Sequence, residues 1–129
     1  MPQGYLLVLT EKNEGLSDIE PILMQMENPQ YISIANSVDQ ANYYIRRFPP
    51  YLVILVGYQK SWAKNFVRHC RQESRGSTTI VALTYRDDPV WISSQYNPGF
   101  DGFLVWPISP AVLLLLIQSA QVRQSCCLS

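Results

Sequence analysis

Five short apolar runs constrain the fold of this chain more than any other feature of its sequence. Each run has the length of a β-strand, and each is apolar nearly throughout instead of alternating between apolar and polar residues. Runs of this kind are typical of strands that are buried on both faces of a parallel sheet. The five expected strands are 5–10 (YLLVLT), 31–35 (YISIA), 51–56 (YLVILV), 78–84 (TTIVALT) and 102–105 (GFLV).

A longer segment with helical signals follows each of these runs. The five expected helices are 17–27, 38–48, 61–74, 88–96 and 109–124. Strands that alternate with helices in this way predict an α/β fold. We expect a doubly wound five-stranded parallel sheet, with helices on both faces and right-handed crossovers throughout.

Capping residues mark the start of several of these helices. Ser37 and Gln40 have the spacing of a capping box, and so do Ser17 and Glu20. Ser109 stands directly before a proline, a residue that suits the first position of a helix. The N-caps that we expect are therefore Ser17, Ser37, Asp88 and Ser109.

Length and charge exclude several classes of protein. The 129 residues suit one domain with one core, which we place at 1–123, followed by a tail at 124–129. Lysine plus arginine equals aspartate plus glutamate at 10 each, which argues against a broad surface for nucleic acid or anionic membrane. No apolar run is long enough to span a bilayer, and the first residues lack the basic start of a signal peptide. We therefore expect a cytoplasmic protein.

The cysteines give no strong signal of chemistry. Three cysteines do not make a disulfide framework. The last four residues, CCLS, match the Cys-a-a-X pattern of prenylated proteins, but no polybasic run precedes them and so short a pattern matches easily by chance. We expect no membrane anchor here.

Three segments of the chain resemble response-regulator receiver domains, and the resemblance covers residues 5–123. FPPYLVILV resembles the family's Pro-Asp-Leu-Val-Leu-Leu-Asp strand, and TTIVALTYR resembles its Pro-Ile-Ile-Ala-Leu-Thr-Ala strand. PGFDGFLVWPISPAVLLLLI is similar to Gly-Ala-Asp-Asp-Phe-Leu-Val-Lys-Pro-Ile-Ser-Pro followed by a leucine-rich helix. The resemblance implies a flavodoxin-like sheet with strand order 2-1-3-4-5 and a role in two-component or phosphorelay signalling.

The residues that perform phosphoryl transfer in receiver domains are largely replaced in this chain. The resemblance places the phosphoacceptor carboxylate at Val56, which has neither a nucleophile nor an acceptor oxygen. It places the two acidic Mg²⁺ ligands at Thr10 and Glu11, so that only one carboxylate remains of a set that needs oxygen ligands. It places the phosphate-binding lysine at Trp106. Aspartyl phosphorylation at Val56 is chemically excluded.

Two receiver positions keep their residue types. Thr84 stands at the hydroxyl position after the fourth strand, and Phe103 stands at the switch aromatic position of the fifth strand. These two residues either form a switch pair or have ordinary structural roles in packing. The absence of a phosphate favours the structural roles. We interpret the chain as a degenerate receiver, or pseudo-receiver, with no Mg²⁺ site, no cofactor and no enzymatic activity. A shift of register does not change this interpretation, because Asp39 is the only acidic residue between Glu27 and Glu73.

Other candidate groups have simpler explanations. His69 and Cys70 are adjacent on an expected helix and point about 100° apart, which does not make a metal or nucleophile pair. Cys70 instead shares core spacing with other apolar residues of that helix. Asp87 and Asp88 resemble a paired carboxylate, but a capping role explains Asp88 and a surface loop explains Asp87. The expected core residues of the 61–74 helix are Trp62, Phe66, Val67 and Cys70.

The last helix carries two apolar stripes, and a helix that is apolar on both sides needs cover on both sides. We assign Leu113, Leu114, Ile117 and Ala120 to the core. The resemblance implies a partner or dimer surface formed by the fourth helix, the fifth strand and the last helix, and Trp91, with Ile92 and Tyr96, would extend it. The expected interface residues are Trp91, Val112, Leu115, Leu116, Ser119 and Val122.

Two functions fit these observations. The first is a signalling domain that is not phosphorylated and that acts through a protein partner or as a homodimer. The second is a sensor of a small ligand in the crevice that the phosphorylation site left behind, where a few polar groups in apolar walls suit binding. An enzyme of another flavodoxin-like family would need a nucleophile–base pair that is not evident. The crevice residues would be Thr10, Glu11, Val56, Tyr58, Thr84 and Trp106.

Overall fold

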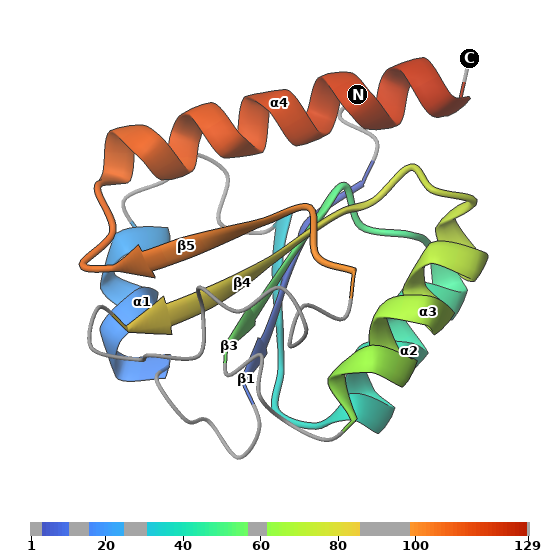
Figure 1. Cartoon of the computed structure of the whole chain (residues 1–129), viewed down its shortest axis with the longest axis horizontal. Helices are drawn as coiled ribbons and strands as arrows, with labels where there is room; N and C mark the ends of the chain where they lie inside the picture. The colour runs from blue at the N-terminus through green and yellow to red at the C-terminus, as the bar shows by residue number, and fades with distance from the viewer. Residues whose placement is uncertain (1–3, 11–15, 25–30, 57–61, 86–98, 129) are drawn as a thin grey trace.

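The computed structural model describes residues 4–10, 16–24, 31–56, 62–85 and 99–128 (Figure 1). All five strands are parallel, in the order β2-β1-β3-β4-β5. This confirms the predicted doubly wound α/β sheet and the strand order that the resemblance implied. The elements in chain order are β1 (Leu6–Thr10), α1 (Leu16–Met24), β2 (Ile32–Ala35), α2 (Val38–Arg47), β3 (Leu52–Val56), α3 (Ala63–Ser74), β4 (Thr79–Tyr85), β5 (Gly102–Trp106) and α4 (Pro110–Leu128).

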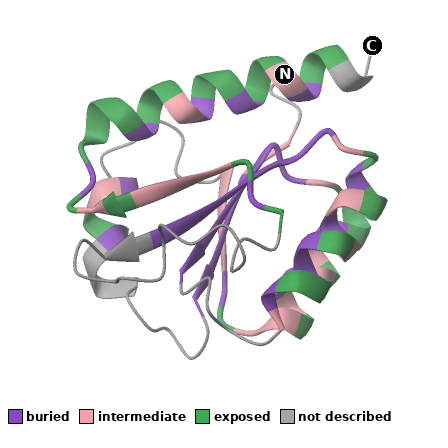
Figure 2. Ribbon diagram, in the orientation of Figure 1, coloured by how far each residue is buried: buried purple, intermediate pink, exposed green. Residues whose placement is uncertain are grey.

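Two helical layers cover the two faces of the sheet. Helices α2 and α3 lie on one face, and α1 and α4 lie on the other (Figure 1). Side chains along each strand alternate between these layers. In β1, Leu7 and Leu9 pack toward α2 and α3, while Leu6 and Val8 pack toward α1 and α4. All of β1 and β3 is buried, as the continuous apolar runs predicted (Figure 2). The prediction is wrong for β2 and β5, which are only partly buried because they are the edge strands of the sheet.

The register of the sheet brings the carboxyl ends of four strands, β1, β3, β4 and β5, to the same edge. Thr10 is in register with Val56, and Val56 is in register with Leu83 of β4. Trp106 is in register with Tyr85 at the end of β4. The carboxyl ends of the parallel strands therefore form one edge, and this edge holds the positions that the resemblance singled out.

One predicted cap is confirmed and another is wrong. The Ser37 side chain accepts a hydrogen bond from the Gln40 N–H at 3.1 Å between Oγ and N, so Ser37 caps α2. The Gln40 side chain accepts from the Asn36 N–H at 2.9 Å, one residue before the cap. Helix α1 contains Leu16, so Ser17 lies inside the helix and is not its N-cap.

The last helix begins as predicted and continues further. Pro110 is its first residue, at the position that the sequence favours. The helix runs to Leu128, beyond the expected end at residue 124, so most of the segment assigned to a tail is helical. The expected helix at 88–96, with its Asp88 cap, lies outside the described residues.

Candidate functional site

Val56 and Trp106 belong to one apolar cluster at the carboxyl edge of the sheet. Val56 ends β3 and is 6% exposed, within the cluster that fills the space between the sheet and helices α1 and α4. Trp106 ends β5, is half-buried and packs against the same cluster. The structure therefore brings together two of the positions that the sequence resemblance singled out. Their side chains provide packing and no charge.

Thr10 is a buried polar residue at the same edge of the sheet. It is completely buried at the end of β1, next to Val56 in the neighbouring strand. Its Oγ1 has no hydrogen-bond partner in the part of the chain that the structure describes. A buried hydroxyl without a partner costs about 1–3 kcal/mol of stability. Thr10 is thus a buried polar group in apolar surroundings.

The residues described at this edge do not fit a Mg²⁺ site. Magnesium prefers six oxygen ligands in octahedral geometry. Val56 offers no oxygen, and Thr10 offers one buried hydroxyl. Among the described residues, no group of three or more His, Cys, Asp and Glu side chains is arranged to hold a metal ion.

The remaining predicted crevice residues are placed only in part. Thr84 lies in β4, in register with Val105 of β5. Glu11 and Tyr58 lie outside the described residues, as do Asp87, Asp88 and Trp91.

Phe103 packs on the opposite face of the sheet from Val56 and Trp106. It is half-buried against the cluster beneath α2 and α3. Its ring makes an edge-to-face contact with Phe100, with ring centroids 5.7 Å apart. Phe103 therefore has a packing partner in Phe100.

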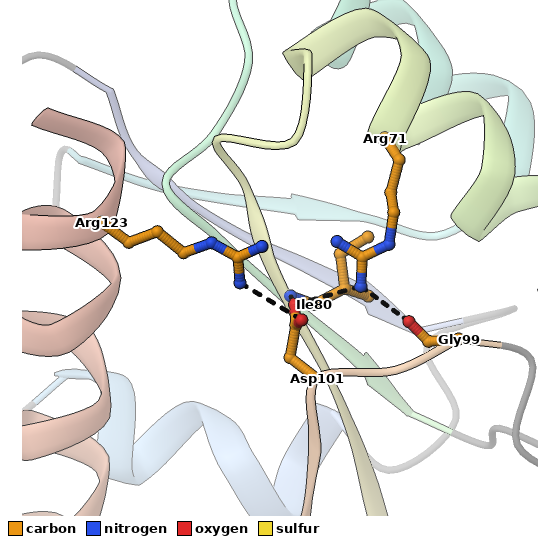
Figure 3. Close-up of polar contacts among 5 residues, drawn as sticks. All are labelled: Arg71, Ile80, Gly99, Asp101 and Arg123. Atoms are coloured by element: carbon orange, nitrogen blue, oxygen red, sulfur yellow. Dashed lines mark hydrogen bonds and ion pairs between the residues drawn. The ribbon is translucent and has the colours of Figure 1, made fainter. Parts of the chain in front are cut away.

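A polar network that the sequence did not reveal occupies the other end of the sheet (Figure 3). Asp101 stands just before β5 and accepts a hydrogen bond from the Ile80 N–H at 2.8 Å between N and Oδ2. Arg71 of α3 lies 3.2 Å from the same oxygen, and Arg123 of α4 lies 3.2 Å from Oδ1. Arg71 also donates to the Gly99 carbonyl at 2.6 Å. One carboxylate thus joins a helix from each layer to two strands.

The network controls the protonation of Asp101. Partial burial by itself would raise the pKa of this carboxyl, but the Ile80 N–H and the Arg123 and Arg71 guanidinium groups outweigh that effect and hold the pKa below its ordinary value. The three donors come from segments that are distant in the sequence, so no local motif identifies them.

Cys70 and His69 are placed as the simpler interpretation predicted. Cys70 is fully buried, and burial raises the pKa of its thiol to about 12, so the reactive thiolate is not formed near neutral pH. His69 Nε2 lies 4.0 Å from Glu73 Oε1 on the same helix. Phe66 and Val67 are buried beside Cys70, and Trp62 packs edge-to-face on Phe66.

The outer side of α4 is apolar and exposed (Figure 2). Val112 is 51% exposed, and Leu115 and Val122 are each 64% exposed. Leu113, Ile117 and Ala120 are buried, as predicted for the core stripe. No helix among the described residues is both long enough and apolar enough to cross a membrane.

Leu114 and Leu116 exchange the places that we expected for them. Leu114, which we assigned to the core, is exposed. Leu116, which we assigned to the outer stripe, is half-buried and packs against the cluster between the sheet and α1 and α4. Successive helical residues are about 100° apart, so a small error in the assumed rotation of the helix exchanges the residues at the margins of a stripe.

The solved structures to which this chain is similar include receiver domains. The signal receiver domain of an HD domain-containing protein from Pseudomonas fluorescens Pf-5 has a TM-score of 0.74 at 21% identity, over 98% of this chain and 92% of that one. A CheY-like receiver domain protein from Methanospirillum hungatei JF-1 has a TM-score of 0.69 at 15% identity, over 95% and 97%.

A third similar structure includes a metal ion. It is the receiver domain of a sensor histidine kinase from Pseudomonas aeruginosa PAO1, with magnesium coordinated in its active-site cleft. Its TM-score is 0.67 at 19% identity, over 92% of this chain and 98% of that one. No protein-family model matches the sequence, and no curated protein matches it either. On the strength of its topology and these structural similarities, the chain has the fold of response-regulator receiver domains.

Proposed function

We propose that this chain is a receiver-like signalling domain that is not phosphorylated and acts through protein–protein contact. The observation that carries the proposal is Val56, a buried aliphatic residue at the end of β3 where a receiver needs a carboxylate. Phosphoryl transfer to this position is impossible because valine has no nucleophilic atom. The proposed role is non-enzymatic and cytoplasmic.

The surroundings of Val56 support this proposal. A phosphoryl group carries a large negative charge, and receivers neutralise it with a lysine and a metal ion. Here Trp106 stands at the lysine position and contributes apolar packing to the cluster that contains Val56. Charged groups left at such an apolar edge without partners would destabilise the fold. The changes at the two positions are therefore physically consistent with each other.

The surface proposed for contact is the outer side of α4, together with the exposed part of β5. Val112, Leu115 and Val122 leave apolar area in water, and contiguous exposed apolar area is typical of interaction sites. Ser119 lies among them and is exposed. Trp91 and Leu116 were also predicted for this surface; Trp91 lies outside the described residues, and Leu116 contributes only the part that the core does not cover.

The alternative, a sensor of a small ligand, receives less support from the described residues. Such a ligand would need space beside Thr10 and Val56. Thr10 is fully buried and Val56 is 6% exposed, so the floor of the crevice is covered. The unpartnered hydroxyl of Thr10 is the one feature that favours a ligand. We therefore place protein contact first.

Incubation with acetyl phosphate and Mg²⁺ tests the loss of phosphoryl transfer. We expect no phosphorylated species in the intact mass of the protein, while an ordinary receiver domain treated in parallel gains one phosphoryl group. A stoichiometric, hydroxylamine-sensitive phosphoryl group on any aspartate of this chain would contradict the proposal.

A further inference from the structure

Basic residues are repeated along one side of α3. Lys64, Arg68 and Arg71 follow one another at steps of four and three, which places them along one line of the helix. Arg75, the C-cap residue, follows after a further step of four. Lys64, Arg68 and Arg75 are exposed, and the Arg71 side chain is 30% exposed. We name these four residues the basic row.

Most of the basic row has no ionic partner in the part of the chain that the structure describes. Arg71 pairs with Asp101. The other three members form no ion pair with any described residue. Glu73, the acidic residue of α3, lies on another side of the helix, where its Oε1 is 4.0 Å from His69 Nε2. The charges of the row are therefore available to a partner of opposite charge.

The arrangement of the row is unfavourable for α3 by itself. Like charges three or four residues apart destabilise a helix, and neighbouring members of the row have this spacing. Lys64 also stands in the first turn, next to the positive end of the helix dipole, and that turn contains no acidic residue. The dipole explains Arg71 and Arg75 at the other end of the helix, but it does not explain Lys64 and Arg68. Contact with an opposite charge would relieve the repulsion.

The size and surroundings of the row favour an acidic protein segment over a nucleic acid. From Lys64 to Arg75 the row extends about 16 Å at 1.5 Å per residue, a length that suits a few carboxylates of a peptide. The exposed residues beside it, Asn65 and Gln72, have amides that hydrogen-bond to carboxylates and no ring on which a base could stack. The chain is neutral as a whole, with 10 basic and 10 acidic residues, so a long polyanion would gain little beyond the row.

The row lies on the other face of the sheet from the contact surface proposed above. Helix α3 covers one face, and α4 covers the other (Figure 1). Exposed residues follow the outer side of α3 along its length (Figure 2). We infer that the basic row binds an acidic segment of a partner protein, through ion pairs between its cations and glutamate or aspartate side chains. This inference does not rest on the proposed function, because the two surfaces are separate.

The first experiment measures the affinity of the full chain for a fluorescent peptide of alternating glutamate and alanine, by fluorescence anisotropy. We expect saturable binding that weakens as the salt concentration rises, since the ion pairs are close to solvent. The same peptide with glutamine in place of glutamate should bind at least about tenfold more weakly. Absence of saturable binding, or equal affinity for the two peptides, would overturn the inference. Tighter binding of an oligo(dT) of the same length would also overturn it.

Two variants with the same change in net charge locate the binding. Lys64→Gln with Arg68→Gln removes both positive charges from the row and should weaken peptide binding about tenfold. Gln118→Glu with Ser125→Glu, at exposed positions of α4, lowers the net charge equally on the other face and should leave the affinity within about twofold of the parent's. An equal loss in the two variants would mean that the peptide responds only to net charge, and would contradict binding at the row.

Thermal unfolding distinguishes a binding role of the row from a structural one. Replacement of Lys64 and Arg68 relieves repulsion between like charges, so this variant should unfold at the same temperature as the parent chain or at a higher one. A clearly lower unfolding temperature would show that these cations stabilise the domain itself, and would contradict their role in binding a partner. The acetyl phosphate experiment has a separate readout, so failure of peptide binding and failure of the non-phosphorylated role are distinguishable.

Discussion

Asp101 and Arg123 lie 3.2 Å apart between Oδ1 and Nη1, and this contact connects the segment before β5 to α4 (Figure 3). The same carboxylate accepts from the Ile80 N–H and pairs with Arg71 of α3. The orientation of α4 on the sheet therefore depends on a residue at the opposite end of the sheet from Val56 and Trp106.

Replacement of Asp101 should destabilise the fold measurably. Asp101→Ala removes charge-assisted bonds to two helices and leaves the Ile80 N–H without its side-chain acceptor, and we expect a loss of about 1.5–3 kcal/mol in the free energy of unfolding. Urea denaturation measures this. Glu73→Gln, which affects only the 4.0 Å contact with His69, serves as the control and should change stability by about 0.5 kcal/mol or less. If Asp101→Ala lowered the free energy of unfolding no more than Glu73→Gln does, the Asp101 network would contribute little to stability.

The same network predicts a dependence of stability on pH. The pKa of Asp101 is lower in the folded chain than the ordinary value of 3.8, so the unfolded chain binds this proton more readily. The stabilisation is present above the ordinary pKa and is lost as pH falls through the folded value. Urea denaturation at neutral pH and at about pH 3 should show a smaller loss for Asp101→Ala than for the parent chain. An identical loss in both proteins would assign the acid sensitivity to other carboxylates.

Two buried threonines should respond oppositely to the same substitution. Thr10→Val removes a hydroxyl that has no partner among the described residues and should stabilise the fold by about 1 kcal/mol. Thr78→Val removes a hydroxyl that donates to the Pro50 carbonyl at 2.5 Å and should destabilise it by about 1–2 kcal/mol. Both residues are fully buried, so the contrast isolates hydrogen bonding from burial. A destabilised Thr10→Val variant would mean that this hydroxyl has a partner in the folded protein.

A carboxylate introduced at Val56 should not confer phosphoryl transfer. Val56→Asp places a charge in the apolar cluster and should cost about 3–5 kcal/mol, while Val56→Asn, of similar shape but neutral, should cost less at neutral pH. We expect neither variant to gain a phosphoryl group from acetyl phosphate and Mg²⁺, because Trp106 does not replace the lysine. Thermal unfolding and intact mass measure the two effects. Efficient phosphorylation of Val56→Asp would show that the rest of the site is intact.

The sequence alone predicted the sheet and the nature of its carboxyl edge. The continuous apolar runs at β1 and β3 predicted burial on both faces, because a strand exposed on one face alternates instead. The resemblance to receiver domains singled out Val56 and Trp106, and the structure places both in one apolar cluster. Local patterns suffice here because strand length and residue type are local properties.

Only the tertiary structure decided the rotation of α4 and the role of Asp101. The exposure of Leu114 and the partial burial of Leu116 depend on how α4 rests on the sheet, and Gln124 and Arg123 fix that rotation through contacts with Pro49 and Asp101. These contacts join residues that lie far apart in the chain. Their energies depend on a geometry that exists only after the helices and strands have packed together, and for that reason no local sequence pattern contains them.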